Sequence, residues 1–88
     1  AIAEMAITAY KNQQKIITEK RDPFQWATIQ ENIGNIYYRL GKSLQDDSLL
    51  EESLEYFHDA LYIFENMDLD ENSKRVTNHI AKTSDLLA

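Results

Sequence analysis

The chain has 88 residues with a net charge of −6, no cysteine, two glycines and one proline. These numbers exclude disulfides and cysteine-based zinc sites, and they leave too few turn residues for an all-β fold. The acidic balance argues against nucleic acid, because phosphate binding depends on clustered Lys and Arg. No run of about 18 apolar residues is present to span a membrane. We therefore expect a single all-α segment over residues 1–88, with neither a nucleic-acid nor a membrane partner.

The first predicted helix covers about residues 2–20. It has no N-cap, since the chain begins inside it, and Asp22-Pro23 ends it because proline disfavours the helical region for the residue before it. One largely apolar stripe recurs at helical spacing: Ile2, Met5, Ala6, Ala9, Tyr10, Gln13 and Ile17. The chain start, Ala-Ile-Ala-Glu-Met, is neither a signal peptide nor a natural initiation site. We expect a fragment of a longer, cytoplasmic protein.

The second predicted helix covers about residues 23–44. Asp22 and Gln25 form a capping-box pattern, and Pro23 suits the first helical position. The clearest amphipathic stripe of the sequence follows: Trp26, Ile29, Ile33, Ile36, Tyr37, Leu40 and Leu44.

Two further helices are predicted over about residues 49–66 and 71–87. Ser48 and Glu51 form the capping box of the third, and Asp70 is the expected cap of the fourth. The third has a wide apolar face that predicts contact with helices on two sides: Leu50, Ser53, Leu54, Tyr56, Phe57, Ala60, Leu61, Tyr62, Ile63 and Phe64. Val76, Ile80, Thr83 and Leu87 mark the face of the fourth. Because the connections are short, sequential helices are expected to pack antiparallel.

An internal repeat appears when the chain is shifted by 47 residues. The segment 6–10 then lies on 53–57, and large apolar residues coincide with one another at several positions: Ile16 with Ile63, Ile29 with Val76, Ile33 with Ile80 and Leu40 with Leu87. Gly34 coincides with Ala81. Small residues at Gly34, Ala60 and Ala81 are expected to let paired helices approach closely. Holding one offset over two helices and a turn indicates a helical-hairpin repeat.

These residues resemble the tetratricopeptide pattern W-x2-L-G-x2-Y…A-x3-F…P. The segment 33–37, Ile-Gly-Asn-Ile-Tyr, stands for its L-G-x2-Y, and Ser53 with Phe57 stands for its A-x3-F. The resemblance covers essentially the whole chain, beginning on the second helix of one unit and ending on the first helix of another. It implies antiparallel hairpins stacked as a right-handed solenoid that serves as a protein-interaction scaffold.

The sequence departs from this pattern in three ways. Trp26 lies one turn before the position of the family's tryptophan, and Ser53 replaces an alanine. The stretch 41–53 is about seven residues longer than in the common unit. Together with Pro23-x-x-Trp26-Ala27, this length resembles a long-unit microbial variant of about 47 residues per repeat.

Catalytic and metal-binding patterns are absent from the sequence. His58 and Asp59 are adjacent, so they point about 100° apart on a helix and do not form one site. His79 lies on another helix, and we expect structural roles for both histidines. The segment 46–48, Asp-Asp-Ser, lacks the spaced ligands of a calcium loop. We therefore expect no enzymatic activity, no metal and no cofactor.

A polar stripe beside the core face of the second helix is the candidate binding surface. In tetratricopeptide arrays the first helix of each unit lines the groove where peptides bind, and the resemblance assigns that role to Thr28, Glu31, Asn35, Tyr38 and Lys42. Their counterparts on the fourth helix under the 47-residue shift are Arg75, Asn78, Lys82 and Asp85, of which the first three are assigned to the binding surface. A solvated helix face is the alternative. The family's carboxylate clamp requires a lysine where Glu31 stands, so a chaperone tail ending in EEVD is a poor candidate.

Three functions remain open. The chain is a repeat segment that binds a partner protein or peptide, a self-associating four-helix bundle for homo-oligomerisation, or a regulatory sensor of short peptides. Self-association through exposed repeat ends is also expected, because stacked units bury one another. Residues 1–44 carry six basic and four acidic groups, whereas residues 45–88 carry three and eleven, which favours head-to-tail contact.

Overall fold

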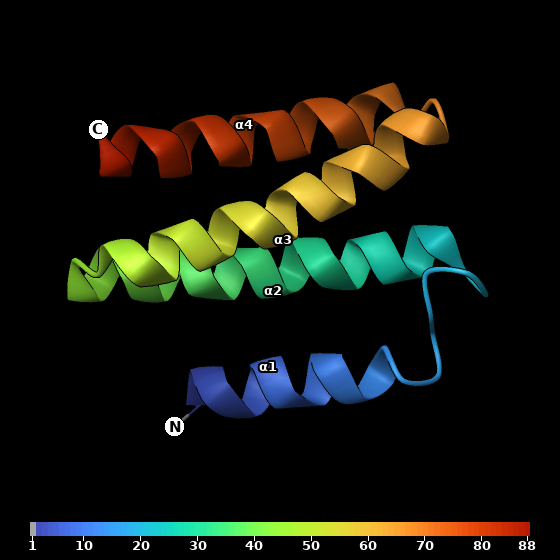
Figure 1. Cartoon of the computed structure of the whole chain (residues 1–88), viewed down its shortest axis with the longest axis horizontal. Helices are drawn as coiled ribbons and strands as arrows, with labels where there is room; N and C mark the ends of the chain where they lie inside the picture. Colours follow the sequence, from blue (N-terminus) through green and yellow to red (C-terminus); the bar gives the residue numbers. More distant parts are fainter. Residues whose placement is uncertain (1) are drawn as a thin grey trace.

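The computed structural model describes residues 2–88 and is built of four α-helices joined by short connections (Figure 1). They are α1 (Ile2–Gln13), α2 (Pro23–Leu44), α3 (Asp47–Asn66) and α4 (Asp70–Leu87). The all-α prediction is confirmed, and α2 has the predicted bounds. Within residues 2–88, no helix has the length and apolar character that crossing a membrane requires.

Helix α1 is shorter than predicted, ending at Gln13 instead of about residue 20. Beyond it the N–H groups of Lys15 and Ile16 bond to carbonyls only three residues earlier, at 3.2 and 3.0 Å, so the chain tightens into turns. The β-branched run 16–18 disfavours continuing the helix here. As a result Ile16 is 68% exposed, while Ile17 remains partly buried.

The predicted apolar stripe of α1 is wrong at four positions, because Ala9 and Gln13 are exposed as well as two residues of its first turns. Ile2 and Met5 are 85% and 72% exposed, whereas Ile7, which was not assigned to the stripe, is the buried residue of this helix. Among residues 2–88, α2 is the main neighbour of α1, so only the side that carries Ile7 and Tyr10 is covered. Leu44 and Tyr62 also lie exposed, contrary to their stripe positions.

Two of the three predicted caps need correction. Asp22 caps α2 as expected, accepting a 3.1 Å bond from the Gln25 N–H. Asp46, and not Ser48, caps α3: its Oδ1 accepts bonds from the Ser48 hydroxyl and from the N–H groups of Ser48 and Leu49, at 2.6, 3.0 and 3.4 Å. These bonds, with the hydroxyl bond as the largest cause, lower the pKa of Asp46.

The start of α4 is set by packing instead of a side-chain cap. Asp68 adopts a positive φ of 57°, and the next residue, Leu69, takes the N-cap position and packs against the core. Asp70 therefore falls inside the first turn and not at the cap. The helix dipole favours its negative charge there.

Helices α2 and α3 form the most closely packed pair, with α1 and α4 on opposite sides of it (Figure 1). A β-carbon added at Gly34 would lie 2.8 Å from the Phe57 ring, so glycine permits this approach. The Ser53 hydroxyl also donates a 2.8 Å hydrogen bond to the Gly34 carbonyl. The predicted close packing at Gly34 and Ala60 is confirmed, whereas Ala81 is exposed because no described helix covers that side of α4.

The core consists of two hydrophobic clusters. The first joins α1 to α2 and contains Ile7, Ile29 and Ile33, with Tyr10, Ile17, Ile36, Tyr37 and Tyr56 packed against them. The second joins α2, α3 and α4 and contains Ala27, Phe57, Ala60, Ile63, Phe64 and Val76. The expectation that α3 touches helices on two sides is confirmed. Residues related by the 47-residue shift, such as Ile29 and Val76, occupy different clusters.

Candidate functional site

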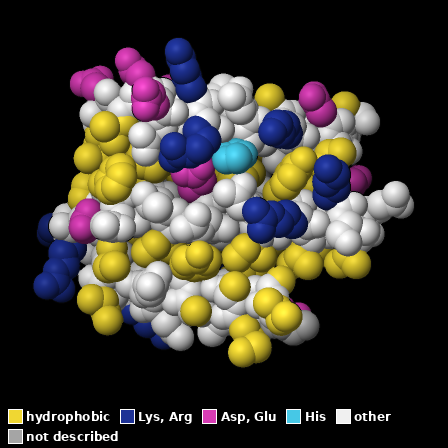
Figure 2. Space-filling view, turned by 180° about the vertical axis from the view of Figure 1, so that it is seen from behind, with side chains coloured by type: hydrophobic (Ala, Val, Ile, Leu, Met, Phe, Trp, Pro, Cys, Tyr) yellow, Lys and Arg dark blue, Asp and Glu magenta, His cyan; other side chains and the backbone are white. Residues whose placement is uncertain are grey.

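The predicted binding residues lie along α2 and α4, which contact each other. We call this surface the α2/α4 face, formed by Thr28, Glu31, Asn35, Tyr38 and Lys42 of α2 and by Arg75, Asn78 and Lys82 of α4. Glu31 is buried, the other α2 residues except Lys42 are half-buried, and Lys42 and the three α4 residues are exposed. Seen from behind the view of Figure 1, basic side chains gather around a histidine and an acidic side chain (Figure 2).

Glu31 is the centre of the α2/α4 face. Its side chain is only 7% exposed, and its carboxylate accepts two hydrogen bonds from the Arg75 guanidinium, at 2.8 and 2.9 Å. Two parallel bonds of this kind fix the relative position of both side chains. The bond to Glu31 raises the pKa of Arg75. The pair links α2 to α4 across the face.

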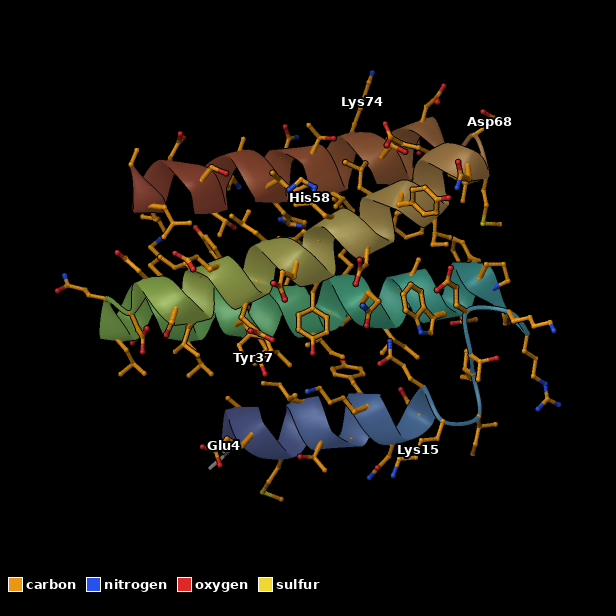
Figure 3. All side chains as sticks on the ribbon, in the orientation of Figure 1. Glu4, Lys15, Tyr37, His58, Asp68 and Lys74 are labelled. Atoms are coloured by element: carbon orange, nitrogen blue, oxygen red, sulfur yellow. The ribbon has the colours of Figure 1, made fainter. Side chains whose placement is uncertain are left out.

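His79 joins this pair, although it was not among the predicted site residues. Its Nε2 lies 3.3 Å from a Glu31 carboxylate oxygen, and its ring stacks on Phe57 with centroids 5.1 Å apart. The sequence signal that was missed is its spacing, because His79 lies one turn after Arg75 on the same side of α4. His58, by contrast, is exposed on α3, on the side seen in Figure 3.

Tyr38 combines a core role with an exposed edge. Its ring packs partly against the second hydrophobic cluster, and the Lys42 Nζ lies 5.9 Å from its centroid, within range of a cation–π contact. Thr28 uses its hydroxyl locally, donating a 2.9 Å bond to the Phe24 carbonyl. Asn35 and Lys42 are therefore the α2 residues best placed to meet a partner.

The charge of the α2/α4 face differs from that of the whole chain. Its eight residues include three bases (Lys42, Arg75 and Lys82) and one acid (Glu31), a balance of +2, or +1 when exposed Asp85, the counterpart of Tyr38, is counted, whereas the chain carries −6. Because Glu31 is buried and bound to Arg75, the exposed positive charge comes mainly from Lys42 and Lys82.

A second polar cluster, unforeseen from the sequence, links α1 and the following turn to α2 and α3. Tyr37 and Tyr56 stack with ring centroids 5.5 Å apart, and a hydrogen bond with Tyr56 raises the pKa of Lys11. Gln14 donates a 2.7 Å bond to Gln30, which donates a 3.1 Å bond to Asp59. These pairs lie far apart in sequence, so helical spacing on one element does not indicate them.

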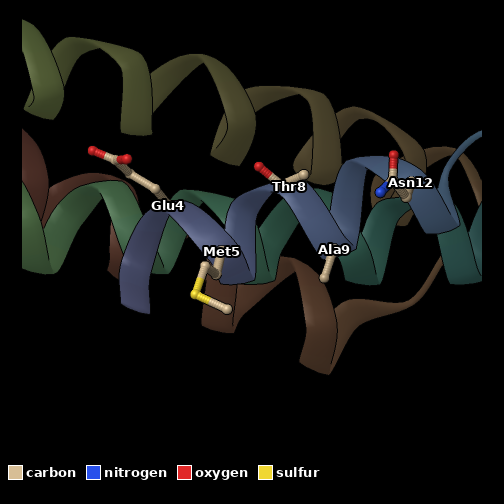
Figure 4. Close-up of a pocket in the computed structure, with 5 residues that line it drawn as sticks. All are labelled: Glu4, Met5, Thr8, Ala9 and Asn12. Atoms are coloured by element: carbon tan, nitrogen blue, oxygen red, sulfur yellow. The ribbon is translucent and has the colours of Figure 1, made fainter. Parts of the chain in front are cut away.

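The outer sides of α1 are hollowed. One shallow hollow follows the helix and is lined by Glu4, Met5, Thr8, Ala9 and Asn12 (Figure 4). A second, which we call the α1/α2 groove, has a volume of about 510 Å³ and is lined by Ile2, Ala3, Ala6, Tyr10, Ile36, Arg39 and Leu40. The groove is largely apolar, unlike the α2/α4 face.

Over residues 2–88, no three His, Asp or Glu side chains come together in an arrangement that could hold a metal ion. Comparison with protein-family models, with curated proteins and with solved structures gives no match for this chain.

Proposed function

We propose that the chain is a protein-interaction module of the helical-repeat type, and that its α2/α4 face binds an acidic peptide segment. The observation that carries this proposal is the positive balance of the α2/α4 face on a chain whose net charge is −6. A positively charged surface on a protein of negative net charge favours the approach of negatively charged partners to that surface.

The arrangement of the helices supports a stacked repeat over the alternative, a closed self-associating bundle. In a bundle, α4 would complete one core together with α1. Here α1 and α4 lie on opposite sides of the α2–α3 pair, and the apolar residues form two clusters. Three pairs related by the 47-residue shift lie in the two clusters, namely Tyr10 with Phe57, Ile29 with Val76 and Ile33 with Ile80, whereas Ile16 is exposed and its counterpart Ile63 is buried. We infer a tetratricopeptide-like solenoid segment from this correspondence.

The buried ion pair gives the proposed binding face a fixed shape. Glu31 and Arg75 bridge α2 and α4, and His79 packs between this pair and Phe57. Neutralisation of Glu31 by Arg75 leaves the exposed amines of Lys42 and Lys82 to attract carboxylates. The half-buried amide of Asn35, two turns before Lys42 on α2, can bond a peptide backbone.

The test compares three fluorescent peptides of equal length by anisotropy: one rich in Glu and Asp, its Gln and Asn equivalent, and one rich in Lys. We expect binding of the acidic peptide alone, weakening with added salt because exposed charges are screened. The double variant Lys42→Glu/Lys82→Glu should lower affinity about tenfold, since exposed charge contacts contribute about 0.2–1 kcal/mol each and reversal also adds repulsion.

The matched control is Lys15→Glu/Lys20→Glu, which makes the same charge change in the exposed turn after α1. We expect it to leave affinity nearly unchanged. An equal loss of affinity in both double variants, or equal binding of all three peptides, would contradict the assignment of the α2/α4 face as the binding surface. Tyr38→Ala and Asn35→Ala should also weaken binding of the acidic peptide. Unchanged affinity in both variants would mean that the binding surface lies elsewhere.

A further inference from the structure

His79 lies within the α2/α4 face, beside the buried carboxylate of Glu31. Its Nε2 is 3.3 Å from the Glu31 Oε2, the same oxygen that accepts the 2.8 Å bond from the Arg75 Nε. A ring nitrogen without a proton would direct its lone pair at this negatively charged oxygen, so Nε2 carries a proton. The imidazole is therefore either the neutral Nε2–H tautomer or the imidazolium, which carries a second proton on Nδ1.

The surroundings of the ring are compatible with its charged form. The side chain of His79 is 27% exposed, so water reaches part of it, and Phe57 stacks on the ring with centroids 5.1 Å apart. An aromatic ring attracts a cation that lies over its face, so this stacking does not oppose a positive charge on the imidazole. Histidine is also the side chain that ordinarily changes its charge between pH 5 and 8.

The neighbours of His79 come from α2, α3 and α4. On α2, the Glu31 carboxylate faces the ring, and on α4 the bases on the adjacent turns are Arg75 and Lys82. On α3 the stacked ring is uncharged, and the other histidine, His58, is exposed on the side of the molecule seen in Figure 3. Of these groups only Glu31 is acidic, and Arg75 already balances it. A second proton on His79 therefore adds one net positive charge to the face.

We propose that protonation of His79 regulates the α2/α4 face, so that the face binds an acidic peptide more tightly as the pH falls. This inference rests on the proposed function and specifies how that same surface is controlled. The charge balance of the face rises by one, from +2 to +3, or from +1 to +2 when Asp85 is counted. Figure 2 shows the histidine of this face among basic side chains, where a bound peptide would sense the added charge.

The added charge lies close to one of the two amines that are expected to attract the peptide. Residues three apart on a helix have β-carbons about 5–6 Å apart, so His79 and Lys82 are neighbours on α4. This separation is shorter than the Debye length of about 8 Å at physiological ionic strength. Salt therefore screens the imidazolium only in part from a peptide carboxylate that contacts Lys82, and the pH effect should grow as the salt concentration is lowered.

The test measures the affinity for the Glu- and Asp-rich peptide by anisotropy at about pH 8 and at about pH 5.5, where histidine is ordinarily uncharged and charged. The chain has two histidines, so His79→Gln and His58→Gln form a matched pair. We expect the unmodified chain and His58→Gln to bind about two- to fivefold more tightly at the lower pH, which is the effect of one exposed charge contact. The affinity of His79→Gln should not rise, and this variant also reports any loss of charge from the peptide itself.

A second measurement uses the unmodified chain and so does not depend on the folding of a variant. NMR follows the ring signals of both histidines in pH titrations with and without the acidic peptide. Coupling between two binding events is reciprocal, so a peptide that prefers protonated His79 must also favour its protonation. We expect saturating peptide to move the titration midpoint of the His79 signal to higher pH and to leave that of His58 in place.

Three results would overturn the regulation by His79. They are equal affinity of the unmodified chain at the two pH values, a rise of the same size in His79→Gln, and an unmoved His79 midpoint with saturating peptide. The variant Lys42→Glu/Lys82→Glu separates this failure from that of the proposed function. If the double variant loses affinity but pH has no effect, only the regulation is wrong. If the double variant binds as well as the unmodified chain, the binding face itself is wrong.

Discussion

At the scale of single residues, close approach of α2 and α3 depends on Gly34. The Phe57 ring, 1% exposed, occupies the space where a β-carbon of residue 34 would lie. Ser53 adds a hydrogen bond to the Gly34 carbonyl, so a serine at this position satisfies its hydroxyl without leaving the core. One small and one polar residue together set the distance between the two central helices.

Gly34→Ala is expected to destabilise the protein, although Gly→Ala within a helix usually stabilises by about 0.5–1 kcal/mol. The added methyl group meets a ring that is held on all sides, and overpacking of this kind costs about 1–3 kcal/mol. Urea unfolding followed by circular dichroism should show a net loss of about 1 kcal/mol. In a Phe57→Leu background the same substitution should be neutral or stabilising, and an equal loss in both backgrounds would contradict the contact.

At the scale of secondary-structure elements, α1 is held differently from the other three helices. It is the shortest helix, contacts mainly α2 within the described chain, and has a single buried residue, Ile7. Its other attachments are the stack of Tyr37 and Tyr56 near Lys11 and the bond from Gln14 to Gln30. Few buried apolar contacts mean that such an element opens at lower free energy than the central pair.

Ile7→Ala is therefore expected to release α1 without unfolding α2–α4. Removing a buried isoleucine costs about 2–5 kcal/mol, which is large for a helix with one buried residue. Hydrogen exchange should show lost protection for the amides of α1, with the amides of α3 unchanged. Met5→Ala, at an exposed position of the same helix, is the matched control. It should change the amide protection of neither α1 nor α3. Uniform loss of protection over all four helices would show that α1 is part of the central folding unit.

At the scale of the whole molecule, the helices form a layered array with extents of 35 × 28 × 15 Å. The first cluster joins α1 to the α2–α3 pair, and the second joins α4 to it. The ion pair of Glu31 and Arg75 adds a polar link between α2 and α4 to the apolar contacts of the second cluster. Its removal should therefore affect the placement of α4 more than that of any other helix.

Arg75→Ala is expected to destabilise the docking of α4 by about 1–3 kcal/mol, because it leaves the buried Glu31 carboxylate without its main partner. The estimate is at the low end for a buried pair, since Arg75 is 48% exposed and water screens part of the interaction. Lys74→Ala, the preceding exposed base, is the control. The melting temperature of Arg75→Ala should be clearly lower than that of Lys74→Ala. Equal melting temperatures would show that the ion pair contributes nothing to stability.

Local signals in the sequence were enough to predict much of the fold. The apolar spacing of α2, the cap at Asp22 and the need for a small residue at Gly34 depend on neighbours within one helix or on a fixed offset between helices. The α2/α4 face was also predicted as a set of residues, because helical spacing alone determines which side chains share one side of a helix. Its use as a binding surface remains a proposal.

The sequence by itself determined the number and approximate extent of the helices, since periodicity, caps and turn residues act over short distances. Only the tertiary structure decided which residues of α1 are buried and how the polar residues pair. Glu31 illustrates the difference. Its spacing marked it as part of a polar stripe, but its burial and its bonds to Arg75 and His79 depend on how α4 packs beside α2, 44 residues further along the chain. Such pairing depends on distances between helices, which a single helix does not encode.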